Sequence, residues 1–392
     1  VSAHLKQMCE NGTSCNILEL VIFVEMRQKL MRSSFLPLVA LLLTACTATA
    51  QVRVQQYNVS TLPDNSVVYA LPETHLYATV TYRKVVRQPG ELALYADRYL
   101  GVRDAILEPS TSYQLVSVDL GSYGVPSDSL RFAVEMHRNS SAANVTLTED
   151  GRLVAVNVTS AIELPSLPME KTIEAVRSKD FGDLKSLPSD YIRATTTSKR
   201  AEIAAQEIYR LRDSRTAVLS GETDQPFADG QALRIAVQGL DAAERSLTER
   251  FIGTTDTITY VRLIRPLDVV EGQQVALRFS EREGLLSSDD LRGEPIYLET
   301  KITERAPELT ERDQKKKEKQ LRKGVVYVVP GSADIRLLYR GSRIAGGSFP
   351  IAQLGSLEAL EGGLFTDKRM ETSVRFDLAT GAILKVDSRP RQ

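Results

Sequence analysis

The chain has 392 residues, with 49 Lys and Arg against 50 Asp and Glu, three Cys, three His and no Trp. The near-neutral charge lacks the basic excess typical of nucleic-acid-binding proteins, so we expect no nucleic-acid partner. Because no Cys follows Cys46 and only His75 and His137 follow it, a disulfide framework, a metal site and a metal cofactor are not expected.

The first 50 residues have the features of an export signal behind an over-extended translation start. The apolar core, 35–43, is much shorter than the roughly 20 residues that span a bilayer, which favours a cleaved signal peptide. Residues 1–25 do not fit such a signal, and Met26 or Met31 is the expected start. The basic residues before the core are Arg27, Lys29 and Arg32.

Two cleavage sites compete at the end of this signal. In one reading, Leu43-Thr44-Ala45-Cys46 is a lipobox, cleavage precedes Cys46, and its thiol receives diacylglycerol. Acyl chains would then hold the protein at a membrane. In the other, signal peptidase recognises Ala48 and Ala50 and cuts before Gln51, which leaves no anchor. Both readings place the protein in the periplasm or at the outer membrane.

Residues 51–160 are predicted to form an N-terminal β-rich domain. Their clearest element is a hairpin over 144–158 around Asp150-Gly151, a pair that suits a tight primed turn. A short helix is predicted over 91–99, ending at Gly101. Alternating apolar residues predict further strands at 51–60, 67–71, 76–82, 113–120 and 130–136.

The middle of the chain is predicted to be helical. Residues 161–195 are rich in Pro, Ser and Asp and are interpreted as an irregular linker. Apolar residues at three- and four-residue steps then predict an αα-hairpin over 196–253. Gly221 is the expected C-cap of its first helix and Asp229 the N-cap of its second.

Residues 254–392 are predicted to form a C-terminal β-rich domain, with strands at 257–264, 274–279 and 296–303. A charged loop, 305–324, is expected to be mobile or a frayed helix. Its Lys315-Lys316-Lys317 run would be able to contact anionic lipid or polysaccharide. Acidic neighbours cancel part of that field, which favours a merely solubilising loop.

A weak internal repeat links the two β-rich segments. Val67-Val68-Tyr69-x-x-Pro72 is matched by Val325-Val326-Tyr327-x-x-Pro330. An alternating strand, a short helical stretch (91–99 or 351–360) and a hairpin (145–158 or 374–386) follow each copy. The predicted fold class is α+β, mainly β, with two sandwich-like β-rich domains flanking a helical hairpin.

No catalytic constellation is evident in the sequence. The acid pairs Glu149-Asp150, Glu281 with Glu283, and Asp289-Asp290 lie among turn residues, and adjacent acids on a strand point to opposite faces. They therefore do not suggest the facing carboxylates of a glycosidase. Phosphate-loop, nucleophile-elbow and zinc-protease motifs are absent. No catalytic residues are predicted, and we do not expect an enzyme.

Two stretches carry a resemblance to a known family. One is Val52-x-Val54-x-x-Tyr57 with Val67–Pro72, and the other is Pro89-Gly90-x-x-Ala93-x-Tyr95-Ala96-x-Arg98-Tyr99-Leu100-Gly101. They resemble the uncharacterised family of exported Bacteroidetes proteins known as domain of unknown function 4831. The resemblance covers nearly all of the mature chain. It implies an envelope protein without an agreed activity, and it favours cleavage before Gln51.

The leading hypothesis is a non-enzymatic interaction or scaffold protein of the periplasm or outer membrane, with envelope proteins as partners. A first alternative is a fimbria-like or adhesive surface lipoprotein, anchored through Cys46. A second is a carbohydrate-binding or carbohydrate-active protein. The absence of Trp weakens it, since only Tyr and Phe remain as stacking platforms for a sugar.

Overall fold

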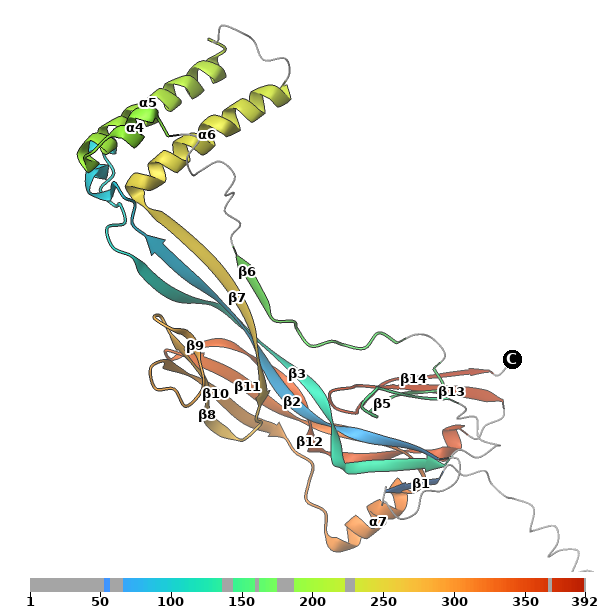
Figure 1. Ribbon diagram of the computed structural model, residues 1–392. Coiled ribbons are helices and arrows are strands. Elements are labelled where there is room, and N and C mark those ends of the chain that lie inside the picture. Colours follow the sequence, from blue (N-terminus) through green and yellow to red (C-terminus); the bar gives the residue numbers. More distant parts are fainter. Residues whose placement is uncertain are drawn as a thin grey trace, which may run out of the picture.

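Three antiparallel sheets and a projecting helical hairpin make up the molecule (Figure 1). The computed structural model describes residues 53–56, 66–135, 144–158, 162–174, 187–222, 230–365 and 369–390. The residues predicted for export and lipidation lie outside this part of the chain, namely Cys46, Ala48, Ala50 and Gln51, and so do His137 and Asp229. Among the helices that the structure describes, none has the length and apolarity to cross a membrane.

The first sheet, sheet A, has the order β1-β3-β2-β7-β6. Two pairs of predicted strands are single strands here: 67–71 and 76–82 belong to β2, and 113–120 and 130–136 belong to β3. Pro72 does not end β2, because it lies at a bulge, where a strand tolerates the missing N–H. The strands are β1 (Arg53–Gln56), β2 (Ser66–Gln88), β3 (Ser110–Glu135), β6 (Lys171–Glu174) and β7 (Thr254–Leu267).

The second sheet, sheet C, has the order β12-β11-β10-β8-β9. The short helix predicted over 351–360 is wrong, because these residues belong to β12 and pair with β11. The predicted loop 305–324 contains helix α7 (Glu311–Leu321), whose first turn is capped by the Thr310 side chain. The strands are β8 (Gly272–Ser280), β9 (Gly284–Leu286), β10 (Glu294–Glu304), β11 (Gly324–Tyr339) and β12 (Ser342–Glu361).

The two predicted hairpins join in one small sheet, sheet B, of order β14-β13-β5-β4. The first turn contains Gly151 at φ 85°, but Asp150 does not have a positive φ, so the turn is not the primed turn expected from the Asp-Gly pair, which needs positive φ at both residues. Strand β5 from the first hairpin pairs with β13 from the second. The strands are β4 (Val145–Leu147), β5 (Leu153–Val156), β13 (Met370–Phe376) and β14 (Ile383–Pro390), and a 3-10 turn, η3 (Gly362–Phe365), precedes β13.

The expected division into two separate β-rich domains is not confirmed, because the two segments share their cores. One core, core 1, joins Tyr69 and Phe132 to Val326 and Phe376. The other, core 2, joins β2 and β3 to β8, β10, β11 and β12. Neither segment could bury its apolar face alone, so the β-rich part is one body of mainly β structure.

A helical arm extends from this body, at the far end of the β2, β3 and β7 ribbon (Figure 1). Helices α5 and α6 occupy the range predicted for the αα-hairpin, and Gly221 ends α5 at φ 78°. The predicted linker 161–195 is wrong in part, since it contains β6, which pairs with β7, and α4. The arm comprises η1 (Ala93–Tyr95), α3 (Ala96–Leu100), α4 (Ser189–Arg193), α5 (Thr197–Ser220) and α6 (Gly230–Ile252).

The repeated Val-Val-Tyr sequence lies on the first strand of each long hairpin, β2–β3 and β11–β12. Each hairpin contains the same irregularity. Leu71 lies opposite the four residues 127–130 of β3, and Pro330 lies opposite the four residues 352–355 of β12. The tips differ: β11–β12 turns at Arg340-Gly341, whereas residues 89–109 between β2 and β3 contribute to the arm.

Candidate functional site

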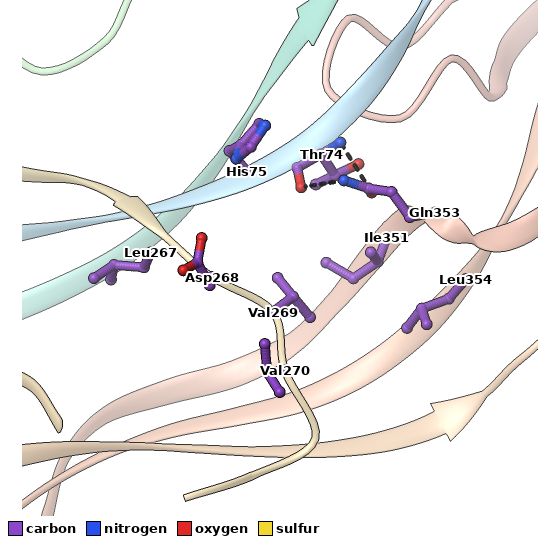
Figure 2. Close-up of a pocket in the computed structure, with 9 residues that line it drawn as sticks. All are labelled: Thr74, His75, Leu267, Asp268, Val269, Val270, Ile351, Gln353 and Leu354. Carbon is purple, nitrogen blue, oxygen red and sulfur yellow. Dashed lines mark hydrogen bonds between the residues drawn. The ribbon is translucent and has the colours of Figure 1, made fainter. Parts of the chain in front are cut away.

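A hollow in the described part of the chain lies where β2 crosses β12 (Figure 2). It is a shallow pocket of about 280 Å³ near the two bulges, and the segment after β7 forms its third side. Its lining residues are Thr74, His75, Leu267, Asp268, Val269, Val270, Ile351, Gln353 and Leu354.

A reciprocal pair of hydrogen bonds joins the two strands at this crossing. The Thr74 N–H donates to the Gln353 Oε1 atom at 3.0 Å, and the Gln353 Nε2 atom donates to the Thr74 carbonyl at 3.0 Å (Figure 2). The Thr74 hydroxyl donates to the carbonyl of Ala379 at 2.8 Å and accepts from the Ala352 N–H at 3.0 Å. Thr74 therefore joins β2 to β12 and to Ala379 through individual hydrogen bonds, where no ladder of backbone hydrogen bonds is formed between the described residues.

These bonds limit what the pocket can do chemically. Thr74 and Gln353 use their polar groups on each other and on the backbone, so they contribute little to a ligand. Most of the lining is aliphatic, and the volume is just below the usual range for small-molecule sites. The pocket thus has the character of a packing defect at a strand crossing, with the Asp268 carboxylate exposed at its rim.

An aromatic cluster lies on the open face of sheet A, opposite the packed face. His75 and Tyr77 point away from core 2, since they alternate with the buried Thr74 and Leu76. The Tyr123 ring lies 5.8 Å from His75 and 6.2 Å from Tyr77. The Arg265 guanidinium lies 5.8 Å from the centre of the Tyr123 ring. His75 is therefore a residue of the sheet surface, within a half-buried cluster.

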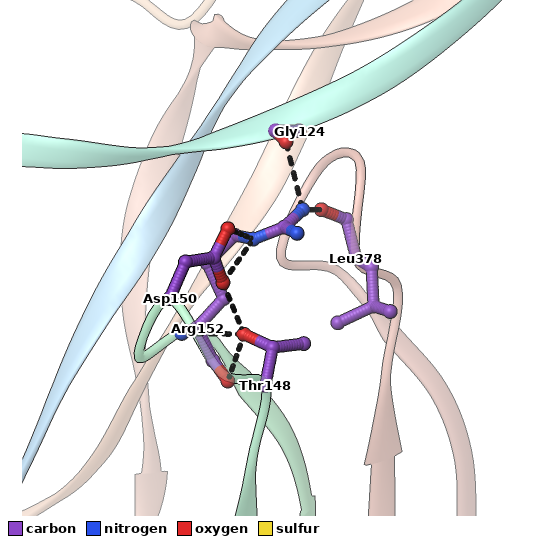
Figure 3. A network of polar contacts seen from close by, with 5 residues as sticks. All are labelled: Gly124, Thr148, Asp150, Arg152 and Leu378. Atoms are coloured by element: carbon purple, nitrogen blue, oxygen red, sulfur yellow. Dashed lines mark hydrogen bonds and ion pairs between the residues drawn. The ribbon is translucent and has the colours of Figure 1, made fainter. Parts of the chain in front are cut away.

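A second polar network ties sheet B to its neighbours (Figure 3). Arg152 donates from Nη1 to the carbonyls of Gly124, at 2.8 Å, and Leu378, at 2.9 Å. Its Nε atom donates to both carboxylate oxygens of Asp150 at 3.0 Å. Burial raises the pKa of Asp150, but hydrogen bonds from Arg152 and Thr148 outweigh it and hold that pKa below its ordinary value. The network is structural, because its donors and acceptors pair with one another.

The joint between ribbon and arm contains a third network. Glu91, after the end of β2, accepts hydrogen bonds from the Tyr191 hydroxyl of α4 and from Arg250 of α6. Burial raises the pKa of Glu91, but these two bonds outweigh it and lower the pKa overall. Gly90 lies so close to α6 that a Cβ atom there would come within 2.2 Å of the Arg250 carbonyl. The arm is therefore fixed rather than hinged at its base.

Acidic residues from the pairs noted in the sequence form ion pairs with arginines. Arg292 binds Asp290 and Glu283, and Arg340 binds Glu281. The pKa of Asp290 falls to about 2, chiefly through its hydrogen bond from Arg292. Within the described ranges, no three His, Cys, Asp or Glu residues gather as metal ligands would.

Sequence reasoning missed the residues that organise these sites. Thr74 and Gln353 are 279 positions apart, and Glu91 is 159 positions from Arg250. A bond between such distant residues leaves no periodic signal in the sequence.

Comparison with known proteins gives a family and nothing more specific. No match to the chain was found among curated proteins or among solved structures. The model of the family described as Domain of unknown function (DUF4831) matches residues 65–384. This span includes both β-rich segments and the arm, and it confirms the resemblance drawn from the sequence. The chain belongs to this family.

Proposed function

We propose that the protein is a non-enzymatic interaction or scaffold protein of the cell envelope, and that the helical arm binds a partner protein there. The observation that carries the proposal is the uneven packing of the arm. Its base is a well-formed core of Leu92, Tyr191, Ile208, Leu247 and Phe251. Its distal half has no comparable core.

The distal half comprises 211–222 and 230–246, and every described side chain there is at least partly exposed. Leu219 is 64% exposed and Ile235 is 62% exposed, both near the end of the hairpin. Helices in proteins are stabilised mainly by packing of an apolar face, so such a pair of helices gains little from its own contacts. Binding to a partner would bury these side chains.

Ion pairs hold the distal helices together instead. Arg212 of α5 lies 2.6 Å from Glu244 of α6, and Arg215 lies 2.9 Å from Asp241. Each of these side chains is partly exposed, and exposed pairs contribute only about 0–1 kcal/mol. These ion pairs fix how α5 and α6 are aligned, and they add little to the stability of the hairpin. A fixed base and a weakly packed end are what a presented binding surface requires.

The envelope location is supported by the signal-like first 50 residues and by the exported family that the chain resembles. The alternatives at Cys46 and Gln51 decide whether a lipid anchor is present. The intact mass of the native protein distinguishes them, since a chain beginning at Gln51 has no acyl group and one beginning at Cys46 carries diacylglycerol.

The partner surface can be tested by site-specific photo-crosslinking in intact cells. A photoreactive residue at Leu219 or Ile235 should give discrete protein adducts. The matched control is Leu384 on β14, which is also 64% exposed but lies outside the arm. Absence of arm adducts, or the same adducts from Leu384, would refute the proposal.

The aromatic cluster favours carbohydrate binding as a second candidate function. Tyr77 and Tyr123 offer ring surface on which a sugar can stack, and Arg265 and His75 offer donors for hydroxyl groups. Saccharide binding by the purified chain should be abolished by Tyr123→Ala and unaffected by Tyr297→Ala, which lies on β10. Equal binding by both variants would exclude this site.

A further inference from the structure

Helix α7 is an exposed helix attached to the body along one side only. Lys317 forms an ion pair with Glu358 of β12, and Leu321 packs against core 1. These two residues are four positions apart, so they mark one face of the helix. All other residues of α7 are exposed.

Four basic residues follow one another along the side of α7 that is turned away from Lys317. Arg312, Lys315, Lys316 and Lys319 have the spacing i, i+3, i+4 and i+7, which places them along one stripe. At 100° per residue, Lys319 points about 160° away from Lys317, and hence away from the body. No carboxylate in the described part of the chain forms a salt bridge with any of the four.

The acidic residues of α7 border this stripe without dividing it: Glu311 lies about 40° from Lys315, and Asp313 lies about 60° from Lys316. Glu311 and Asp313 lie in the first turn, where they suit the positive end of the helix dipole. Asp313 is also engaged by the Thr310 hydroxyl at 2.7 Å. Glu318 lies about 100° from Lys317 and so at the edge of the stripe. In the sequence alone, the acidic and basic residues of this run are mixed. In the helix, the four basic residues lie next to one another along one side.

The stripe lies at the end of the body where the chain enters it. Strand β1 and helix α7 both contact β11, and both are drawn at the lower end of the body in Figure 1. β1 begins at Arg53, seven positions after Cys46. Seven extended residues span at most about 25 Å. A lipid on Cys46 would therefore hold the start of β1, and with it the end of the body that includes α7, near a membrane surface.

We propose that the basic face of α7 binds an anionic lipid surface. Clusters of four or more Lys and Arg on a helix are attracted to anionic headgroups. Three of the four cations are Lys, a compact charge without the planar geometry of Arg for specific recognition, which suits an array of headgroups. The net charge of the whole chain is −1, so the attraction is local to this helix.

This inference rests on the proposed envelope location for the presence of a membrane, but its test is independent of the arm and of lipidation. The purified chain from Gln51 to Gln392 is sedimented with vesicles of phosphatidylcholine alone or mixed with phosphatidylglycerol. We expect binding only to the anionic vesicles, weakening steeply as salt increases.

The decisive variant replaces three lysines of the stripe: Lys315→Gln, Lys316→Gln and Lys319→Gln. Each charge near an anionic surface contributes about fivefold in binding, so the triple variant should bind about 100-fold more weakly. A matched control removes the same charge elsewhere, with Lys171→Gln, Lys199→Gln and Lys301→Gln on three other elements. It should bind within about threefold of the parent chain, and unchanged thermal unfolding of both variants confirms their folding.

Several results would overturn the inference. These are failure to prefer anionic vesicles, an equal loss in the control variant, and tighter binding to an acidic polysaccharide than to vesicles. Vesicle binding through α7 without crosslinks from the arm would sink the scaffold proposal and leave this inference standing. Arm crosslinks without vesicle binding would do the reverse.

Discussion

The side chain of Tyr69 bridges the two large sheets, and its hydroxyl group gives a sharp test of how they are joined. Tyr69 is 1% exposed, and its ring packs 6.0 Å from that of Phe132. The hydroxyl accepts from the Val326 N–H at 2.8 Å and donates to the Val326 carbonyl at 3.0 Å. Strand β10 pairs with β11 only from Ser332 to Tyr339, so in the described part of the chain β10 does not pair with Val326.

Replacing Tyr69 by Phe removes this hydroxyl and leaves the ring in place. The N–H and the carbonyl of Val326 would then both be buried without a partner. A buried unpaired polar group costs about 1–3 kcal/mol, so we expect the free energy of unfolding to fall by about 3 kcal/mol. The cost of a cavity is small, because only one oxygen atom is lost.

Denaturant unfolding measures this difference, and amide hydrogen exchange at Val326 shows where it originates. The exchange rate at Val326 should rise in Tyr69→Phe, and the slope of unfolding against denaturant should stay constant. Tyr297→Phe is the control, since Tyr297 is 36% exposed and should change stability by less than about 0.5 kcal/mol. A Tyr69→Phe variant as stable as the control would refute the bridging role.

Four further predictions follow from the same structure. Burial raises the pKa of Tyr69 in the folded state, so Tyr69 ionises at lower pH in the unfolded state, and the free energy of unfolding should fall above about pH 10. The fall should be less steep in Tyr69→Phe, which denaturant unfolding measured across this pH range would show. The lowered pKa of Asp150 adds stability above about pH 4 that is lost as pH falls further, and Asp150→Asn should flatten this acid limb of the same titration. Arg152→Ala leaves two carbonyls without their donor and should cost about 2–3 kcal/mol in denaturant unfolding. Gly90→Ala forces the ribbon away from Arg250 and should speed proteolysis within the arm while the sheets keep their exchange protection.

Local patterns predicted most of the elements correctly. The hairpin around Asp150-Gly151, the αα-hairpin and its Gly221 cap follow from residues that lie within a few positions of one another. Such signals act through backbone conformation and through a single helix face, both of which the sequence contains directly.

Errors arose where distant contacts override local preference. Residues 351–360 have a Leu-rich helical pattern, yet β11 pairs with Ile351 and with residues 356–360 on the two sides of the bulge and makes the segment strand. Pro72 looked like a strand end, because its tolerance depends on a bulge in β3. The charged run 305–324 was expected to be mobile or a frayed helix, and its ordered helix α7 was not foreseen because its anchoring through Lys317 and Leu321 requires β12 and core 1.

The repeated bulges explain why the two β-rich segments share cores instead of forming separate domains. Before its bulge, each long hairpin contributes to core 1, with Tyr69 and Leu71 from β2 and Val326 and Val328 from β11. After its bulge, each contributes to core 2. Bulges bend a strand and change its twist, so they allow one hairpin to contribute side chains to two cores. The Thr74–Gln353 bonds lie at this change of core, where they fix the two hairpins against each other and set the direction in which the β2–β3 ribbon carries the arm.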